Sequence, residues 1–529
     1  MNRNNSDHMA NNNYLIVIDI GTTEIKGVLF SPSEIIDSKQ KDFSLIFPGQ
    51  ACVEQDPEEL KNLIYDITKE LIENNKSVLN YIKGLTFTSQ MQNTIALDKN
   101  GIPLMNVLSW MDQRAQNFAK EVIWNGSKLF RIHGFPILKL LKFLNITNGA
   151  PGFNGKDTVA KLGYIKQKLP DIYTKVNKFL DIKDYAIFLA TRKFITSPDM
   201  AGITWLMDVR KGRFKWSEEI HKMYNLDPQK MPEIMNSTSI VGNICPEFSR
   251  KTGLSQKVKV INGAGDLLTA AIGSGAIEDG KIVINVGTSG LVGTHHPVSS
   301  TDTQHYTGTI ISGIPGKHFV ISKQETLGGA LEWIKNLFGT ESFTDIDNMV
   351  KITPPGANGV IFTPWLFGER SPINNPSLRG QFFNLGLNVT KGDMYRSVFE
   401  GVAFNLLWGL KYVEKISRKK VKKQNDEVRF IGGAANSDVW AQIFADVFQR
   451  KILQMLNPQL VSAIGAATIG WVSLGVYNDF NEVNKLVGIK KTYEPSTESA
   501  KIYRKIFKNY QKLYIQNRKI FENLNAFHN

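Results

Sequence analysis

The chain has 529 residues, too many for one hydrophobic core, so two or more domains are expected. Its 42% hydrophobic and 21% charged residues are typical of an ordinary globular protein. Only two cysteines, Cys52 and Cys245, are present, which excludes a disulfide framework, and they show no metal-ligand spacing. This usage favours a cytoplasmic location.

The formal net charge of +14 makes nucleic acid a candidate partner. Lys and Arg concentrate at 415–423 and 501–519, and aromatic residues recur at helical spacing in the second stretch, where exposed rings could stack on bases. We favour a basic, helical C-terminal extension over 486–529 that buries its aromatic stripe and exposes its lysines. No nucleic-acid partner is therefore expected.

Two segments bear on targeting. Residues 1–13 are rich in asparagine and lack an apolar stretch, which predicts a disordered tail instead of a signal peptide. Residues 460–477 carry no charge and approach the length of a membrane span. Their Gly, Ala and Ser content favours a helix packed tightly inside a globular domain, so no membrane association is expected.

In chain order, the first predicted element is a β-hairpin with strands at 14–20 and 25–30. Its turn, Gly21-Thr22-Thr23, would offer N–H and hydroxyl groups to a phosphate. Asp19 at the strand end could hold Mg²⁺, and Lys26 could neutralise phosphate charge. An ordinary hairpin turn is the alternative interpretation.

A helix is predicted over 57–74, because Asp56-Pro57 is a cap followed by a first-turn proline. The next strand, at 81–88, places Met91 and Gln92 just beyond its end. Strands that alternate with helices indicate an α/β domain with ligand groups beyond the strand ends. The following loop carries Trp110, Asp112 and Arg114, whose side chains could contact a sugar. The alternative is that the Trp is buried and that the two charged residues form an ion pair at the surface.

The central segment has a strand at 258–261, a glycine turn, and Asp266 at the start of a helix rich in small residues. A carboxylate there could act as a base, or merely cap the helix. A second strand then ends in the turn Gly287-Thr288-Ser289-Gly290. This turn repeats the first hairpin, since Ile18-Asp-Ile-Gly-Thr-Thr matches Ile284-Asn-Val-Gly-Thr-Ser. The repeat indicates two similar α/β halves that face one nucleotide.

Near residue 430 a strand at 428–431 runs into Gly432-Gly433 and another helix. Glycines at this turn could let an adenosine approach the backbone, although an ordinary loop is the alternative.

Taken together, these motifs resemble the FGGY family of carbohydrate kinases, and within it the xylulokinase-like branch. The resemblance covers roughly residues 14–477, and the motifs occur in the order typical of the family: Asp19-Ile-Gly-Thr-Thr23, Ser89-Gln-Met-Gln92, Trp110-Met-Asp-Gln-Arg114, Gly263-Ala-Gly-Asp266, Gly287-Thr-Ser-Gly290, Gly368-Glu-Arg-Ser-Pro-Ile-Asn-Asn-Pro-Ser-Leu-Arg-Gly380 and Gly432 to Ser437.

The resemblance implies two actin-like ATPase (ribonuclease H-like) α/β domains that flank a deep catalytic cleft. The N-terminal, sugar-binding domain would span 14–274 and the C-terminal, ATP-binding domain 275–485. Asp266 would be the catalytic base and contact the sugar, and Asp19 would lie near Mg²⁺. The other implied contacts are Gly21, Thr22, Thr23, Lys26, Gly287, Thr288, Ser289, Gly432, Gly433 and Asn436 for ATP, and Met91, Gln92, Trp110, Asp112 and Arg114 for the sugar.

The expected function is ATP-dependent phosphorylation of a sugar hydroxyl, with D-xylulose or a similar ketopentose as substrate and a homodimer as one form of assembly. Two positions depart from xylulokinases, which usually have His at the position of Gln92 and often Asn at that of Leu267. Other sugars or polyols (gluconate, ribulose, glycerol) therefore stay open as substrates. An actin- or chaperone-like ATPase is the alternative from another class.

Overall fold

The computed structural model describes residues 13–126, 130–132, 134–339, 342–418, 420–421 and 426–525. Residues 1–12 of the expected tail, residues 419, 422 and 423 of the first basic stretch, and residues 526–529 of the C-terminal extension lie outside this set. The chain forms two compact units. Unit 1 contains Met1–Gly273, Ile310–Lys317 and Ser462–Leu486, and unit 2 contains Ser274–Thr309, His318–Val461 and Val487–Asn529. Residues 462–486 thus pack with the N-terminal part of the chain.

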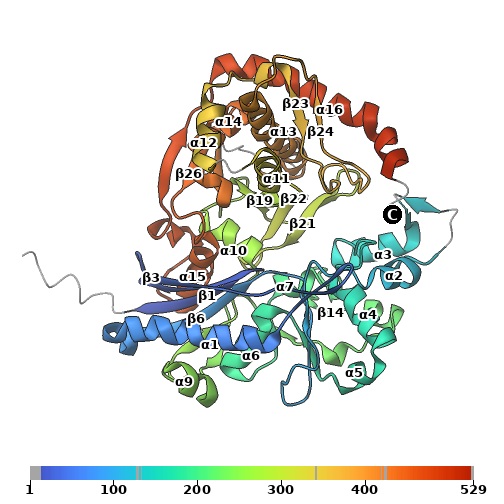
Figure 1. Cartoon of the computed structure of the whole chain (residues 1–529). Helices are drawn as coiled ribbons and strands as arrows, with labels where there is room; N and C mark the ends of the chain where they lie inside the picture. The colour runs from blue at the N-terminus through green and yellow to red at the C-terminus, as the bar shows by residue number, and fades with distance from the viewer. Residues whose placement is uncertain are drawn as a thin grey trace, which may run out of the picture. The chain divides into compact units, whose positions relative to one another are not determined.

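Unit 1 is built on a six-stranded mixed sheet (Figure 1). In spatial order its strands are β16 (Ile240–Asn243), β17 (Lys259–Ile261), β6 (Ile82–Ser89), β1 (Tyr14–Ile20), β2 (Glu24–Phe30) and β3 (Ile35–Asp42). Strands β1, β2 and β3 form an antiparallel meander, whereas β6 lies parallel to β1 and β17 parallel to β6. The predicted hairpin is confirmed.

Helices cover both faces of this sheet. Helix α1 (Pro57–Asn74) begins as expected, because the Asp56 side chain accepts a hydrogen bond from the backbone N–H of Glu58 and Pro57 occupies the first turn. It packs with α6 (Ile182–Thr191) and α9 (Pro246–Thr252) around the buried side chains of β1 and β6. On the other face lie α10 (Asp266–Gly273) and α15 (Val461–Ser473) (Figure 1).

Helix α15 is the uncharged, small-residue stretch, and its composition reflects close packing. A Cβ atom added at Gly465 would lie 1.8 Å from the carbonyl oxygen of Thr269 in α10, and one at Gly470 would lie 2.6 Å from the Leu15 side chain. The two helices therefore approach each other closely enough for their backbones to touch. Among the described residues, no helix is long and apolar enough to cross a membrane.

Replacing Gly465 by alanine is expected to destabilise the protein by several kcal/mol, because the new methyl group meets fixed backbone and must push α10 away. Gly470→Ala on the same helix is the matched control. Its methyl group meets only the flexible Leu15 side chain, and alanine also favours the helix by about 1 kcal/mol. Thermal unfolding measures both variants, and equal melting temperatures would contradict this account of the packing.

Unit 2 repeats the topology of unit 1 in an eight-stranded sheet. Strands β18, β19 and β22 form an antiparallel meander, β25 is parallel to β18, and β26 is parallel to β25. The strands in spatial order are β20 (Thr301–Asp302), β21 (Thr307–Ile311), β22 (His318–Gln324), β19 (Gly290–His296), β18 (Ile282–Val286), β25 (Glu427–Ile431), β26 (Lys451–Met455) and β27 (Ile489–Tyr493). The internal repeat in the sequence therefore reflects two sheets of the same construction.

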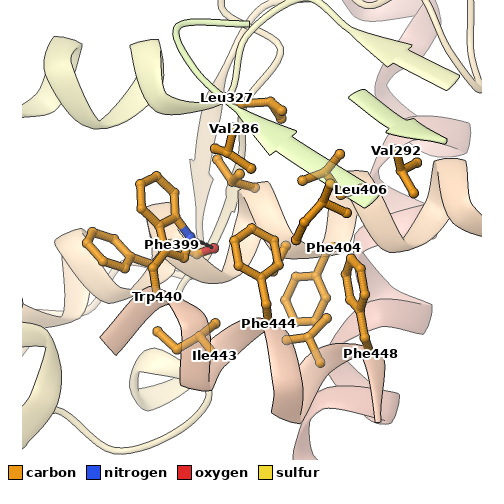
Figure 2. Packing of buried hydrophobic residues seen from close by; sticks show 14 of the residues in the cluster. Val286, Val292, Leu327, Phe399, Phe404, Leu406, Trp440, Ile443, Phe444 and Phe448 are labelled. Atoms are coloured by element: carbon orange, nitrogen blue, oxygen red, sulfur yellow. Dashed lines mark hydrogen bonds between the residues drawn. The ribbon is translucent and has the colours of Figure 1, made fainter. Parts of the chain in front are cut away.

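The core of unit 2 lies between this sheet and the helices α11 (Gly328–Phe338), α12 (Phe343–Ile352), α13 (Lys391–Ser417) and α14 (Asp438–Phe448). Figure 2 shows how aromatic side chains of α13 and α14 interlock. The rings of Phe399 and Trp440 stack with centroids 4.3 Å apart, and the Trp440 indole N–H donates to the Phe399 carbonyl oxygen at 3.1 Å. The buried indole is thereby satisfied.

The C-terminal extension is part of this core. Helix α16 (Thr497–Asn525) buries Tyr503, Phe507, Tyr510 and Leu513, which recur at helical spacing along one face. The Tyr510 hydroxyl donates to Asn405 of α13 at 3.0 Å. The rings of Tyr503, Phe507 and Tyr510 are therefore not available to stack on bases. Tyr514, the fourth aromatic residue of the stripe, is partly buried against the same core, so burial of the stripe is confirmed for three of its four rings.

Candidate active site

In unit 1, three of the predicted functional segments follow the carboxyl ends of three neighbouring parallel strands. The turn at Gly21 follows β1, the Gln90 loop follows β6, and the Asn262 turn follows β17. The register pairs Ile20 with Ser89, and the Gln90 N–H donates to the Ile20 carbonyl oxygen at 2.9 Å. Because parallel strands end at the same sheet edge, the topology brings these segments together.

Asp266 is the first residue of α10, directly after the glycine turn. Its Oδ1 accepts a hydrogen bond from the backbone N–H of Leu267 at 2.7 Å, and its side chain is partly exposed. Gly263 has a φ of +72°, and a Cβ there would lie 2.1 Å from the Phe87 carbonyl oxygen, so only glycine fits. A Cβ at Gly265 would lie 2.5 Å from Met91, so the Met91 side chain packs on the residue that precedes Asp266.

Asp19 lies at the end of β1, opposite Lys26 in the hairpin register. Burial raises the pKa of its carboxyl group to about 6, while the charge of Lys26 acts in the opposite direction. The Lys26 ammonium is in an ion pair with Glu24, whose other oxygen accepts from Gln40 at 2.7 Å. The lysine is therefore held by a carboxylate at the hairpin turn.

The hairpin turn contacts the predicted sugar-binding loops directly. The Trp110 indole N–H donates to the Thr22 hydroxyl at 3.1 Å, and that hydroxyl lies 3.2 Å from Gln90 Oε1. Gln55 joins the same group through both atoms of its amide. Sequence reasoning missed Gln55, although an inward-facing polar residue in the short strand β5 (Cys52–Gln55) was a usable signal.

Gln92 is held on several sides and has a φ of +70°. Its side-chain amide donates to Asp157 Oδ1 at 3.1 Å, and Asp157 also accepts from the Trp205 indole at 2.7 Å. Its backbone N–H donates to Asp181 at 2.8 Å. The position where xylulokinases usually carry His is therefore a fixed hydrogen-bonding group.

Lys161 of α4 (Thr158–Lys168) is a fully buried lysine that the sequence analysis also missed. Its ammonium donates to the carbonyl oxygens of Gln92 at 2.8 Å and of Ser109 at 2.7 Å, so it ties together the two loops that are predicted to bind the sugar. Burial lowers the pKa of Lys161 to about 8, against the opposing effect of nearby carboxylates, of which Asp112 is the largest contributor.

This lowered pKa predicts a pH dependence of stability. Between the folded pKa of about 8 and the unfolded value of 10.5, the unfolded chain binds more protons at Lys161 than the folded chain. The free energy of unfolding of the wild type, minus that of Lys161→Met, should therefore rise with pH across this window by up to about 1.4 kcal/mol per unit. Denaturant titrations at several pH values measure it. Lys168→Met, at an exposed position of α4, should give a flat difference.

Trp110, Asp112 and Arg114 have different environments. Trp110 is partly exposed, whereas the Asp112 carboxylate is fully buried and accepts from the Val53 N–H at 2.7 Å. Arg114 forms ion pairs with Asp112 at 2.8 Å and with Glu54 at 2.7 Å. Burial by itself would lower the pKa of Arg114, but the hydrogen bonds and ion pairs with Asp112 and Glu54 together outweigh burial and raise that pKa. Asp112 and Arg114 thus brace the loop that carries Trp110.

One cationic side chain lies beside Trp110. The Lys156 ammonium is 5.8 Å from the centroid of the Trp110 ring. The preceding Gly155 has a φ of +73°, and a Cβ there would lie 2.3 Å from the backbone nitrogen of Gln116, so the loop at this point is fixed by its backbone.

In unit 2, the turn Gly287–Ser289 joins β18 to β19 and packs on the first residues of α11. The carbonyl oxygen of Gly287 accepts from the Gly328 N–H at 2.8 Å, and that of Thr288 accepts from the Gly329 N–H at 3.1 Å. These bonds fix the turn through its backbone. The Thr288 side chain is exposed, and Ser289 is partly exposed.

The second glycine turn of unit 2 lies beside the first. Strands β18 and β25 are parallel neighbours. Gly287 after β18 and Gly432 after β25 therefore lie at the same edge of the sheet. A Cβ at Gly432 would lie 2.6 Å from the Val286 carbonyl oxygen, whereas one at Gly433 would meet nothing within 4 Å. Asn436 is exposed and donates to the Gly433 carbonyl oxygen at 3.2 Å. Unit 2 thus brings its six predicted ATP contacts to one sheet edge.

The side chains and turns at these sheet edges can be compared with what Mg²⁺ and ATP would need for binding. Within the described part of the chain, no group of three or more His, Cys, Asp or Glu residues could form a metal site made by protein alone. Mg²⁺ that binds together with phosphate needs only one or two carboxylates from the protein, and Asp19 can supply one. A Cβ at Gly433 would meet nothing within 4 Å, so the turn leaves space beside its backbone there. The donor set fits both.

Comparison with known proteins gives one consistent family. Residues 14–273 match the N-terminal domain and residues 282–474 the C-terminal domain of the FGGY family of carbohydrate kinases. The chain is 28% identical to a gluconokinase of Bacillus subtilis (93% of each chain covered) and 29% identical to a xylulose kinase of Staphylococcus epidermidis (96% of this chain, 97% of the relative). The crystal structure of a ligand-bound xylulose kinase from Lactobacillus acidophilus aligns with a TM-score of 0.85 at 25% identity, covering 97% of this chain and all of the other.

Proposed function

Because this chain belongs to the FGGY family of carbohydrate kinases and is an ATP-dependent sugar phosphotransferase, we propose that it phosphorylates a hydroxyl group of a ketopentose such as D-xylulose. The observation that carries the proposal is the surroundings of Asp266. A partly exposed carboxylate opens α10, and the Met91 side chain packs on the residue before it. The loop that begins with Met91 continues into Gln92, at the position of the xylulokinase histidine.

The proposed mechanism gives each residue a separate task. Asp266 accepts the proton of the attacking sugar hydroxyl. The turns at Gly21–Thr23 and Gly287–Ser289 bind phosphate oxygens, and Gly432, Gly433 and Asn436 contact the adenosine. Asp19 would hold Mg²⁺, which when bound would offset the negative charge of the phosphates. Met91, Gln92 and Trp110 contact the sugar, and Asp112 with Arg114 keeps the Trp110 loop in place.

A second candidate substrate is gluconate. Its support is Lys156, because an ammonium group 5.8 Å from the Trp110 ring centroid supplies positive charge on the sugar side, where a carboxylate would bind. The relatives named gluconokinase and xylulose kinase have nearly equal identity to the chain, which leaves both substrates in the proposal. We also propose that the protein is cytoplasmic and that it forms a homodimer.

The test is ADP release with D-xylulose, D-ribulose, gluconate and glycerol, each with ATP and Mg²⁺. Turnover that is fastest with D-xylulose supports the proposal, and turnover that is fastest with gluconate favours the second candidate. Lys156→Met separates the two further, since it should raise the KM for gluconate but leave that for D-xylulose nearly unchanged. ATP turnover unaffected by every sugar, yet stimulated by protein or peptide, would instead favour an actin- or chaperone-like ATPase.

A further inference from the structure

We propose that Thr22, Gln55 and Gln90 form a hydrogen-bonded ring, to which Trp110 is attached through the Thr22 hydroxyl, and that this ring couples sugar binding to ATP binding within unit 1, with Gln55 as the positioning residue that closes it. The inference rests on the proposed function, because it takes Trp110 as a sugar contact and the turn at Gly21–Thr23 as a phosphate contact. It goes further by assigning a role to Gln55 and a direct link between the two ligands.

Three hydrogen bonds close the ring, and a fourth attaches Trp110 to it. The Trp110 indole N–H donates to the Thr22 hydroxyl at 3.1 Å, and this hydroxyl donates to Gln90 Oε1 at 3.2 Å. The Gln90 amide nitrogen donates to Gln55 Oε1 at 2.9 Å, and the Gln55 amide nitrogen donates to the Thr22 carbonyl oxygen at 2.8 Å. The last bond returns to Thr22, where the ring closes.

The direction of every bond follows from Trp110. An indole nitrogen can only donate, so the Thr22 hydroxyl must accept there and give its single proton to Gln90. The oxygen of the Gln90 amide is then the acceptor, its nitrogen faces Gln55, and the Gln55 amide is oriented in turn. Both amide orientations are therefore set by the chemistry of the ring.

Burial makes the ring behave as one unit. Gln55 is fully buried and Gln90 is 2% exposed, so water cannot replace a partner that either glutamine loses. Leaving one member unpaired would carry the desolvation cost of a buried polar group. The same strand also fixes the Trp110 loop, because the Val53 N–H donates to Asp112 at 2.7 Å.

The ring joins the sugar side to the phosphate side through residues of unit 1 alone. A sugar that packs on Trp110 restrains the indole and, through Thr22, orders the backbone of the phosphate-binding turn. By thermodynamic linkage, a phosphate bound at the turn must strengthen sugar binding by the same factor. A saturating sugar is expected to lower the Kd for ATP by about fivefold or more.

The test measures this factor directly. Calorimetry with a non-hydrolysable ATP analogue gives its Kd with and without the sugar that is most active in the ADP-release panel. Gln55→Met keeps the length of the side chain but removes both hydrogen bonds, and it is expected to abolish the effect of the sugar. Gln50→Met is the matched control, because Gln50 is exposed just before the strand that carries Gln55, and it should keep the full effect.

A double-mutant cycle separates the ring from a merely structural role. Thr22→Val removes the hydroxyl with little change of shape, and it decides the matter if Gln55→Met does not fold. If both residues act in one ring, the double variant loses no more coupling than either single variant. Undiminished coupling in Gln55→Met, or additive losses in the cycle, would overturn the inference while the kinase proposal stands. A wild type without sugar-dependent ADP release would overturn both.

Discussion

Asp266→Asn is expected to lower sugar-dependent ADP release by about 100- to 10,000-fold while the protein still folds. Asparagine has the shape of aspartate, and its amide oxygen can still accept the hydrogen bond from the Leu267 N–H at 2.7 Å. It also suits the start of a helix. What it cannot do is take a proton from the attacking hydroxyl. The variant should therefore lose kcat, with a change in the KM for sugar that is small by comparison.

A matched control is Asp345→Asn. Asp345 is also an aspartate in the first turn of a helix, but it is exposed and its carboxylate accepts from the Ser342 hydroxyl at 2.7 Å. This variant should keep wild-type turnover. A coupled ADP assay and thermal unfolding are run on both proteins. If Asp266→Asn retained turnover within tenfold of the wild type, Asp266 could not be the base.

Gly432→Ala should both weaken ATP binding and destabilise unit 2. Gly432 has a φ of 89° and a ψ of 175°, a region that is essentially restricted to glycine, at a cost of about 1–3 kcal/mol for other residues. Its Cβ would also lie 2.5 Å from Asn285 Oδ1 and 2.6 Å from the Val286 carbonyl oxygen. Val286 directly precedes the Gly287 turn. Relief of this clash would therefore displace the Gly287 turn and the Gly432 turn together, and both are predicted to contact ATP.

Gly433→Ala is the internal control for stability, because a Cβ at that position meets no atom within 4 Å. Thermal unfolding should show a clear drop for Gly432→Ala and little change for Gly433→Ala. The KM for ATP should rise at least tenfold in Gly432→Ala, at saturating sugar. If the two variants melted together and bound ATP alike, the packing of the Gly432 turn against β18 would not govern nucleotide binding.

The sequence by itself determined the features that depend on neighbouring residues. The hairpin appeared with its turn at Gly21, and α1 begins at Pro57 because Asp56 and Pro57 form a local start signal. Apolar alternation and helix caps act over a few residues, so a single sequence reveals them. The aromatic stripe of α16 was also interpreted correctly from its spacing. Motif order then indicated the family, which the family matches confirm.

The tertiary structure alone decided which side chains meet over long distances in the chain. Gln55 reaches Thr22 and Gln90, which are 33 and 35 residues away, and Lys161 reaches the Gln92 carbonyl across 69 residues. Residues 462–486 pack back into unit 1, where Gly465 meets Thr269. Such contacts depend on how strands and helices are ordered in space, and no local pattern of hydrophobicity or capping encodes that order. The buried position of Asp112 likewise follows from β5, a strand that lies far from it in sequence.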